Sequence, residues 1–230
     1  GCVWHQIGMI LKMHHLQRSD LESCTRSTPT TLIISLISAS MEASGASAQP
    51  VKLPAKKKLT YSIPDEDMAV KIAQDASGTN MEIPIALGML GLRRSEICGL
   101  ELSDLDGSIL HIHSVVVYGA DAKPVRKQTP KTDESDRYIR IPDELADQIR
   151  KQGYITHMRP DAITRGFQRL IEKGKYPHIR FHDLRHFFVS YAHTVLGLSD
   201  AQIMKMGGWA TSAVMRAVYL QSMEDEKAAE

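Results

Sequence analysis

Three short segments of this sequence carry cationic side chains of the types that bind phosphate. They are GLRRSE at residues 91–96, KTDESDR at 131–137 and HDLRH at 182–186. The guanidinium group of arginine forms two parallel hydrogen bonds to a phosphate and stays charged near neutral pH. In the third segment, a spacing of three places His182 and Arg185 on one face of a helix. Together these residue types could bind the oxygens of a phosphate and move a proton beside it.

Such a set could also support transfer of a phosphoryl group to a tyrosine without a metal. This transfer needs a nucleophile, stabilisation of the developing charge and a proton for the leaving oxygen. A tyrosine phenol has an ordinary pKa near ~10, and nearby cations favour its anion. Tyr219 lies ten residues after the sequence GGW, and Tyr118 and Tyr191 are the alternatives. We expect Tyr191 to pack against Phe187 and Phe188, which would make it a poor nucleophile.

The order of these motifs resembles that of the tyrosine recombinases, the family of the phage-type integrases. GLRRSE, KTDESDR, HDLRH, GGW and a late tyrosine follow one another as in that family, over about residues 60–222. The ordered set is specific, although each motif alone arises by chance in many helices. The resemblance implies a site-specific DNA recombinase that cleaves and rejoins DNA through a 3′-phosphotyrosyl intermediate. It also implies double-stranded DNA attachment sites as partners, and a homotetramer on DNA in the full-length protein.

The resemblance implies three residues that bind the phosphate. Arg93 and Arg185 would hold the non-bridging oxygens, and the position directly after Gly-Leu selects Arg93 over Arg94. Trp209 stands where the family usually has histidine and sometimes tryptophan. Its indole N–H can donate to phosphate but cannot shuttle a proton. Taken singly, Arg93 could instead pair with Glu96 across a turn, and Trp209 could be a core residue.

Three further residues would attack or move protons. The resemblance makes Tyr219 the nucleophile and His182 either the acceptor of its proton or a phosphate ligand. Lys131, in a polar loop between two expected strands, would protonate the departing 5′ oxygen. Lys127 is the alternative, and the match to Lys-Thr-x-x-Ser-x-Arg favours Lys131.

Two other functions would use part of the same machinery. A type IB topoisomerase would relax supercoiled DNA by the same chemistry without a paired DNA site. A truncated DNA-binding remnant would hold DNA without cleaving it. The complete set of catalytic residue types argues against decay within the catalytic domain.

Two histidine pairs have spacings that occur at metal sites. His182 and His186 are four apart on an expected helix, but the glutamate of a zincin motif is absent. His111 and His113 are two apart on an expected strand, without a supporting carboxylate nearby. The three cysteines include no CxxC pair. We therefore expect neither a metal nor another cofactor.

Hydrophobic periodicity predicts a mainly helical protein with a small antiparallel β-sheet, an α+β fold. Strands are expected at 109–117 and 138–141, and alternation in the first predicts one face formed by Ile109, His111, His113, Val115 and Val117. Helices are expected at 32–41, 62–76, 81–90, 93–100, 143–151, 160–173, 182–195, 199–206 and 212–221.

Composition fits a folded protein that works on DNA. Of the 230 residues, 43% are apolar and 24% are charged, which argues against global disorder. The net charge is only +1, but residues 150–185 contain nine Lys or Arg and three Asp or Glu, as a basic groove would. The apolar run at 32–37 is too short to span a bilayer, and no signal sequence is evident. We expect a cytoplasmic, DNA-associated protein without a membrane partner.

The chain is expected to contain three parts. Residues 1–42 are interpreted as a partial or scrambled remnant of a helical core-binding domain, since the first thirty residues show no regular period. Residues 43–60 are interpreted as a linker, because they combine small residues, two prolines and a three-lysine run. Residues 61–230 are the expected tyrosine recombinase catalytic domain, and the resemblance implies that the two domains form a C-shaped clamp on DNA.

Overall fold

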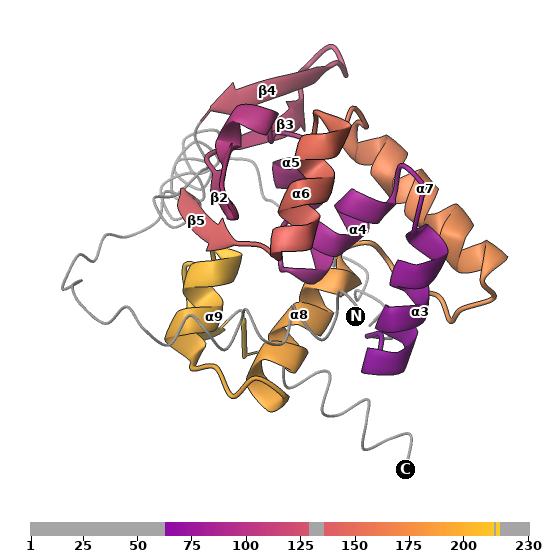
Figure 1. The fold of residues 1–230 in the computed structure, drawn as a ribbon, viewed down its shortest axis with the longest axis vertical. Helices are drawn as coiled ribbons and strands as arrows, with labels where there is room; N and C mark the ends of the chain where they lie inside the picture. The colour runs from indigo at the N-terminus through magenta and orange to yellow at the C-terminus, as the bar shows by residue number, and fades with distance from the viewer. Residues whose placement is uncertain (1–62, 129–135, 214, 217–230) are drawn as a thin grey trace, which may run out of the picture. The chain divides into compact units, whose positions relative to one another are not determined.

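The computed structural model describes residues 63–128, 136–213 and 215–216, and the fold of this part is shown in Figure 1. It is mainly helical with short antiparallel strands, which confirms the expected α+β class. Its helices are α3 (Glu66–Ala76), α4 (Glu82–Met89), α5 (Arg94–Ile97), α6 (Asp143–Gln152), α7 (Pro160–Lys173), α8 (Asp183–Thr194) and α9 (Asp200–Gly207), with a 3-10 turn at Leu102–Asp104.

The helix ends follow local sequence signals. Asp65 caps α3, because its side chain accepts a hydrogen bond from the Met68 backbone N–H at 2.7 Å. Ser199 caps α9 in the same way through Gln202, and Gly153 ends α6 in the left-handed region at φ 83°. The expected helix at 32–41, the proposed linker and most of the expected helix at 212–221 lie outside the described residues.

The strands form two small sheets instead of the single expected one. In one sheet β2 (Ile109–Ile112) pairs antiparallel with both β1 (Leu105–Asp106) and β5 (Arg137–Arg140), and β3 (Ser114–Tyr118) pairs antiparallel with β4 (Pro124–Gln128) in a separate hairpin. The expected strand at 109–117 is divided at His113 into β2 and β3.

The face expected for the first strand is not the face that enters the core. Leu110 and Ile112 are buried in the core, whereas Ile109 is 48% exposed. The buried face of this strand is therefore formed by Leu110 and Ile112, whose apolar side chains pack in the core. Strand β4 was not expected either, since its polar residues have little strand preference, and pairing with β3 makes it a strand.

Helix α4 lies at the centre of the helical part and packs against α3, α5 and α8. It is buried over most of its length, as its apolar sequence predicts. Pro84 is tolerated because it lies in the first turn, where a backbone N–H has no partner within the helix. Gly91 then turns the chain at φ 91°, and a Cβ there would lie 2.7 Å from the Phe188 ring. The glycine thus allows α4 to lie close to α8 and directs Arg93 out of the core.

Among the described residues, no helix is both long and apolar enough to cross a membrane.

Candidate active site

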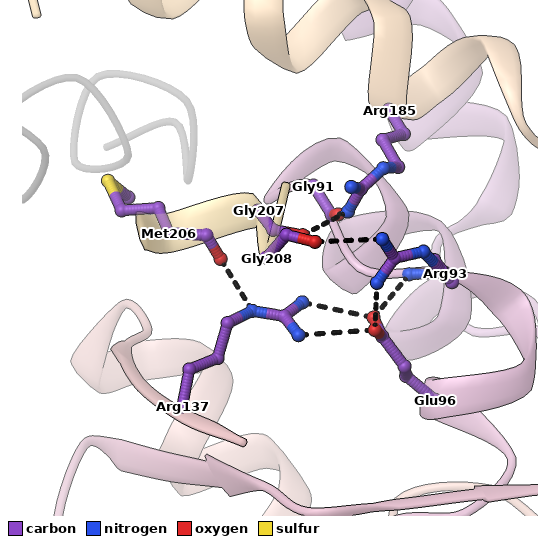
Figure 2. A network of polar contacts seen from close by, with 8 residues as sticks. All are labelled: Gly91, Arg93, Glu96, Arg137, Arg185, Met206, Gly207 and Gly208. Carbon is purple, nitrogen blue, oxygen red and sulfur yellow. Dashed lines mark hydrogen bonds and ion pairs between the residues drawn. The ribbon is translucent and has the colours of Figure 1, made fainter. Parts of the chain in front are cut away.

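Arg93 lies immediately before α5 and reaches toward the end of α9. Its Nη1 donates to Glu96 Oε1 at 2.6 Å, and its Nη2 donates to the Gly208 carbonyl at 2.8 Å. Figure 2 shows both contacts. The pair with Glu96 that the local sequence allowed is therefore present. It coexists with a second contact that joins Arg93 to a distant part of the chain.

Arg185 is a buried arginine on α8, and only 2% of its surface is exposed. Its Nη1 donates to the carbonyls of Gly91 and Gly207, the latter at 2.6 Å. Its Nη2 has no hydrogen-bond partner among the residues that the structure describes. A buried, unsatisfied guanidinium N–H is costly, so this nitrogen is a donor suited to an anion.

The two arginines converge on one helix end. The carbonyls at the end of a helix carry partial negative charge and have no partner within the helix, so they attract cations. Burial, and then the nearby charge of Arg93, lower the pKa of Arg185 to about 8, with Glu96 acting in the opposite direction. Two guanidinium groups so close together create a site that favours an anion.

Trp209 covers the guanidinium of Arg185. The Cζ atom of Arg185 lies 3.5 Å from the centre of the indole ring, a cation–π contact. Gly208 turns the chain back at φ 67°, and a Cβ on Gly207 would overlap the indole ring. The turn Gly207-Gly208 is thus what allows Trp209 to lie over Arg185. The sequence predicted an indole N–H donor to phosphate, and the described contact is through the face of the ring.

His182 lies at the surface, just before α8. Desolvation, and then the neighbouring His186 and Arg185, lower the pKa of His182 to about 4. The rings of His182 and His186 meet edge to face, with centres 5.0 Å apart. At neutral pH the His182 ring is therefore uncharged in the free protein, and an uncharged imidazole can accept a proton.

Arg137 and Glu96 complete the cluster, and neither was assigned a role from the sequence. Glu96 is 2% exposed and Arg137 is 5% exposed. Their side chains form a two-pronged ion pair, with N–O distances of 3.0 and 3.1 Å. Both residues occur in the motifs GLRRSE and KTDESDR, so the motifs held the signal that could have found them.

Lys131 and Tyr219, the expected acid and nucleophile, lie outside the described residues. The chain that leads to Tyr219 is described as far as Arg216. Met215 is fully buried, and Arg216 Nε donates to Asp200 Oδ2 at 2.6 Å. This part of the chain is therefore held to the start of α9 three positions before Tyr219.

The alternative residues are engaged elsewhere. Arg94 donates to Thr164 on α7 and not to the end of α9. Tyr191 stacks on Phe187, with ring centres 5.4 Å apart, as expected for a packing residue. The hydroxyl of Tyr118 donates to Asp161, and this hydrogen bond raises the pKa of Tyr118.

The expectation that His111 and His113 lack a carboxylate nearby was wrong. His111 Nε2 lies 2.8 Å from Asp136, and His113 Nε2 lies 2.9 Å from Asp104. Asp104 and Asp136 come from other segments of the chain, so the spacing of residues around the two histidines could not predict these contacts. Within the described ranges, no group of three or more His, Cys, Asp or Glu side chains is placed to hold a metal ion.

Comparison with known proteins identifies the fold as that of a tyrosine recombinase catalytic domain. The structure of XerA recombinase matches with a TM-score of 0.56 and 19% identity, covering 88% of this chain and 77% of that one. The Tn1549 transposon integrase in complex with a circular intermediate DNA matches with a TM-score of 0.61 and 15% identity, covering 98% and 93%.

A lambda integrase tetramer bound to a Holliday junction matches with a TM-score of 0.58 and 16% identity, covering 79% of this chain and 57% of that one. Neither the protein-family models nor the curated proteins include a match to this sequence. At these identities the likeness concerns the fold, so the chemistry has to be argued from the residues of the site.

Proposed function

We propose that this chain is a site-specific DNA recombinase that cleaves and rejoins DNA through a 3′-phosphotyrosyl intermediate on Tyr219. The observation that carries the proposal is the pairing of Arg93 and Arg185 at the end of α9, where Arg185 Nη2 is an unused donor within the described residues. A DNA phosphodiester is an anion that such a pair can bind with both guanidinium groups.

The charge of the reaction supports the same assignment. Attack on a phosphodiester builds negative charge on the two non-bridging oxygens, and Arg93 and Arg185 would stabilise it. Removal of one fixed donor that points at developing charge typically raises the activation barrier by about 3 kcal/mol. The negative charge of Glu96 offsets only one of the positive charges of Arg93, Arg137 and Arg185. The cluster therefore keeps a net positive charge.

Proton transfer is assigned to residues around this pair. His182, uncharged at neutral pH, would accept the phenolic proton of Tyr219 or bind the phosphate once protonated. Lys131 would protonate the 5′ oxygen as it leaves. Trp209, whose ring face covers Arg185, would contribute the N–H at its ring edge to the phosphate.

The partners are proposed from the fold and from this chemistry. We infer that the chain acts on double-stranded DNA attachment sites as a homotetramer, and that it is a cytoplasmic, DNA-associated enzyme. The solved lambda integrase tetramer bound to a Holliday junction has a similar fold. In this proposal residues 61–230 form the catalytic domain, residues 43–60 the linker, and residues 1–42 belong to a helical core-binding domain.

The test is formation of a covalent protein–DNA adduct. Nicked duplexes drawn from the DNA that borders the coding region serve as substrates, because the nick prevents religation and traps the intermediate. We expect an SDS-resistant band with the unmodified chain, in excess EDTA as well, since the guanidinium groups carry the charge that a metal would otherwise carry. Loss of the band on chelation, restored by zinc or magnesium, would contradict the metal-free mechanism.

Two further outcomes identify the other functions. Relaxation of many supercoiled plasmids per enzyme, without a paired site, would favour a type IB topoisomerase. DNA binding without any adduct would favour a remnant that holds DNA only.

A further inference from the structure

Arg137 is a buried cation to which the proposed chemistry assigns no role. It is the first residue of β5, and its Nε donates to the Met206 carbonyl at 2.8 Å. Its Nη1 and Nη2 donate to Glu96 at 3.1 and 3.0 Å. Figure 2 shows these contacts side by side with those of Arg93. Arg137 therefore ties the start of β5 both to α5 and to the last turn of α9.

Glu96 is shared between Arg137 and Arg93. Glu96 Oε1 accepts from Arg93 Nη1 at 2.6 Å and from Arg137 Nη1 at 3.1 Å. Glu96 Oε2 accepts from the Arg93 backbone N–H at 2.7 Å and from Arg137 Nη2 at 3.0 Å. Burial opposes ionisation of this carboxyl, but the charges of Arg137 and Arg93 hold the pKa of Glu96 below its ordinary value. The carboxylate is thus charged and satisfied by both arginines.

The division of Glu96 between two arginines leaves Arg93 free to make another contact. Arg93 uses Nη1 for Glu96 and keeps Nη2 for the Gly208 carbonyl. Without Arg137, the buried Glu96 carboxylate would keep only Arg93 as a cationic partner among the residues that the structure describes. A buried carboxylate that has lost one cationic partner is strongly destabilised, so it favours more hydrogen bonds from the partner that remains. Arg93 would then turn both nitrogens toward Glu96, and the Met206 carbonyl would lose its donor.

We propose that Arg137 is a positioning residue. It holds the Arg93 guanidinium toward the phosphate by sharing the Glu96 carboxylate with Arg93 and by fixing the end of α9. The inference rests on the proposed function, because it concerns the orientation of Arg93 during DNA cleavage. It goes beyond that function in assigning work to a residue that would touch neither the DNA nor the reacting atoms.

The experiment is a double-mutant cycle on the rate of adduct formation by the full chain, in a single turnover and well below every variant's unfolding temperature. Arg137→Met should slow the reaction by roughly tenfold or more, because small misplacements of catalytic groups are costly. In an Arg93→Ala background, the same change should slow the reaction by a clearly smaller factor, since no Arg93 guanidinium remains to be positioned and only the contact with the end of α9 is lost. A residue with only a general structural role would slow both backgrounds alike.

Three further variants complete the comparison. Arg140→Met is the matched control, because Arg140 lies on the same strand with a 42% exposed side chain, and it should leave the rate unchanged. Arg137→Lys keeps the charge but not the two-pronged contact, so its rate should fall between those of the wild type and Arg137→Met. Arg137→Met combined with Glu96→Gln should recover part of the lost rate, because no unpaired carboxylate remains to hold Arg93.

The outcomes separate this inference from the function on which it rests. If the unmodified chain forms no adduct, both fail together. If it is active but Arg137→Met costs the same factor with and without Arg93, the positioning role is overturned and the proposed function stands. If Arg137→Met does not fold, Arg137→Lys is carried through the same Arg93 cycle. Equal losses for Arg137→Lys in both backgrounds would then overturn the proposal.

Discussion

Arg93 and Arg185 donate hydrogen bonds to neighbouring carbonyls at the end of α9, Arg93 to Gly208 at 2.8 Å and Arg185 to Gly207 at 2.6 Å. The first arginine comes from the turn after α4 and the second from α8, so three segments meet at one point. The same turn positions Trp209 over Arg185. The end of α9 is therefore the element that brings the candidate site together.

Substitution of Arg93 should slow adduct formation far more than substitution of its neighbour Arg94. Arg93→Ala is expected to slow adduct formation by about a hundredfold or more, because it removes a donor from the developing charge on the phosphate. Arg94→Ala should change the rate by less than about twofold, since Arg94 contacts Thr164 on α7. Single-turnover rates of the two variants decide the matter. A larger loss for Arg94→Ala would mean that the wrong arginine has been assigned.

The low pKa of His182 predicts a pH dependence of stability. The unfolded ring has an ordinary pKa near ~6.5, and in the folded chain the pKa of His182 is about 4. Between these values the unfolded state binds a proton that the folded state does not, so stability falls as the pH drops from about 6.5 to 4. Because the ring is exposed, solvent screening keeps the loss below the ~1.4 kcal/mol per pH unit of one whole proton.

Thermal unfolding of His182→Asn should accordingly depend less on pH in that window than unfolding of the wild type. His178→Asn is the matched control, because His178 is an exposed histidine outside the cluster. Identical pH slopes for His182→Asn and the wild type would refute the low pKa of His182.

Trp209 should report phosphate binding directly. The chain contains two tryptophans, so a Trp4→Phe variant leaves Trp209 as the sole indole emitter. Binding of a duplex should change its fluorescence, because a phosphate bound to Arg185 brings negative charge close to the indole ring that lies 3.5 Å from the Arg185 guanidinium. The change should saturate together with binding measured by the anisotropy of labelled DNA. Saturated binding with unaltered emission would place the phosphate elsewhere.

Lys131 is expected to act as the general acid for the 5′ oxygen. Lys131→Ala should cleave an ordinary phosphodiester roughly a hundredfold more slowly. On a 5′-bridging phosphorothiolate it should recover most of that rate, since a thiolate leaves without a proton. Arg93→Ala should not recover, because the charge on the phosphate still needs stabilisation. Rescue of Lys127→Ala in place of Lys131→Ala would move the assignment to the neighbouring lysine.

Local signals in the sequence were enough to predict most of the helices. Helix α7 has the expected bounds, because Pro160 suits a first helical position and Gly174 follows the last. Motif order also predicted that Arg93, His182 and Arg185 belong together, and Arg93 and Arg185 do meet at the end of α9.

The contacts that the sequence did not predict are made between distant segments. The division of the first strand at His113 accompanies pairing with Asp104, and the burial of Arg137 depends on Glu96. Nothing in the periodicity of one segment indicates which distant carboxylate its cation will meet. The stacking of Trp209 on Arg185 is of the same kind, since it depends on a turn that joins α9 to α8 in space.

The nucleophile gives the most direct test of the whole account. Tyr219→Phe should abolish the SDS-resistant adduct while leaving DNA binding unchanged, because the substitution removes only the attacking oxygen. Tyr191→Phe, at a residue that stacks on Phe187, should still form the adduct. Digestion of the wild-type adduct and mass spectrometry should locate a 3′-phosphate on Tyr219. An adduct that persists in Tyr219→Phe, or a phosphate attached to Tyr191, would contradict the account.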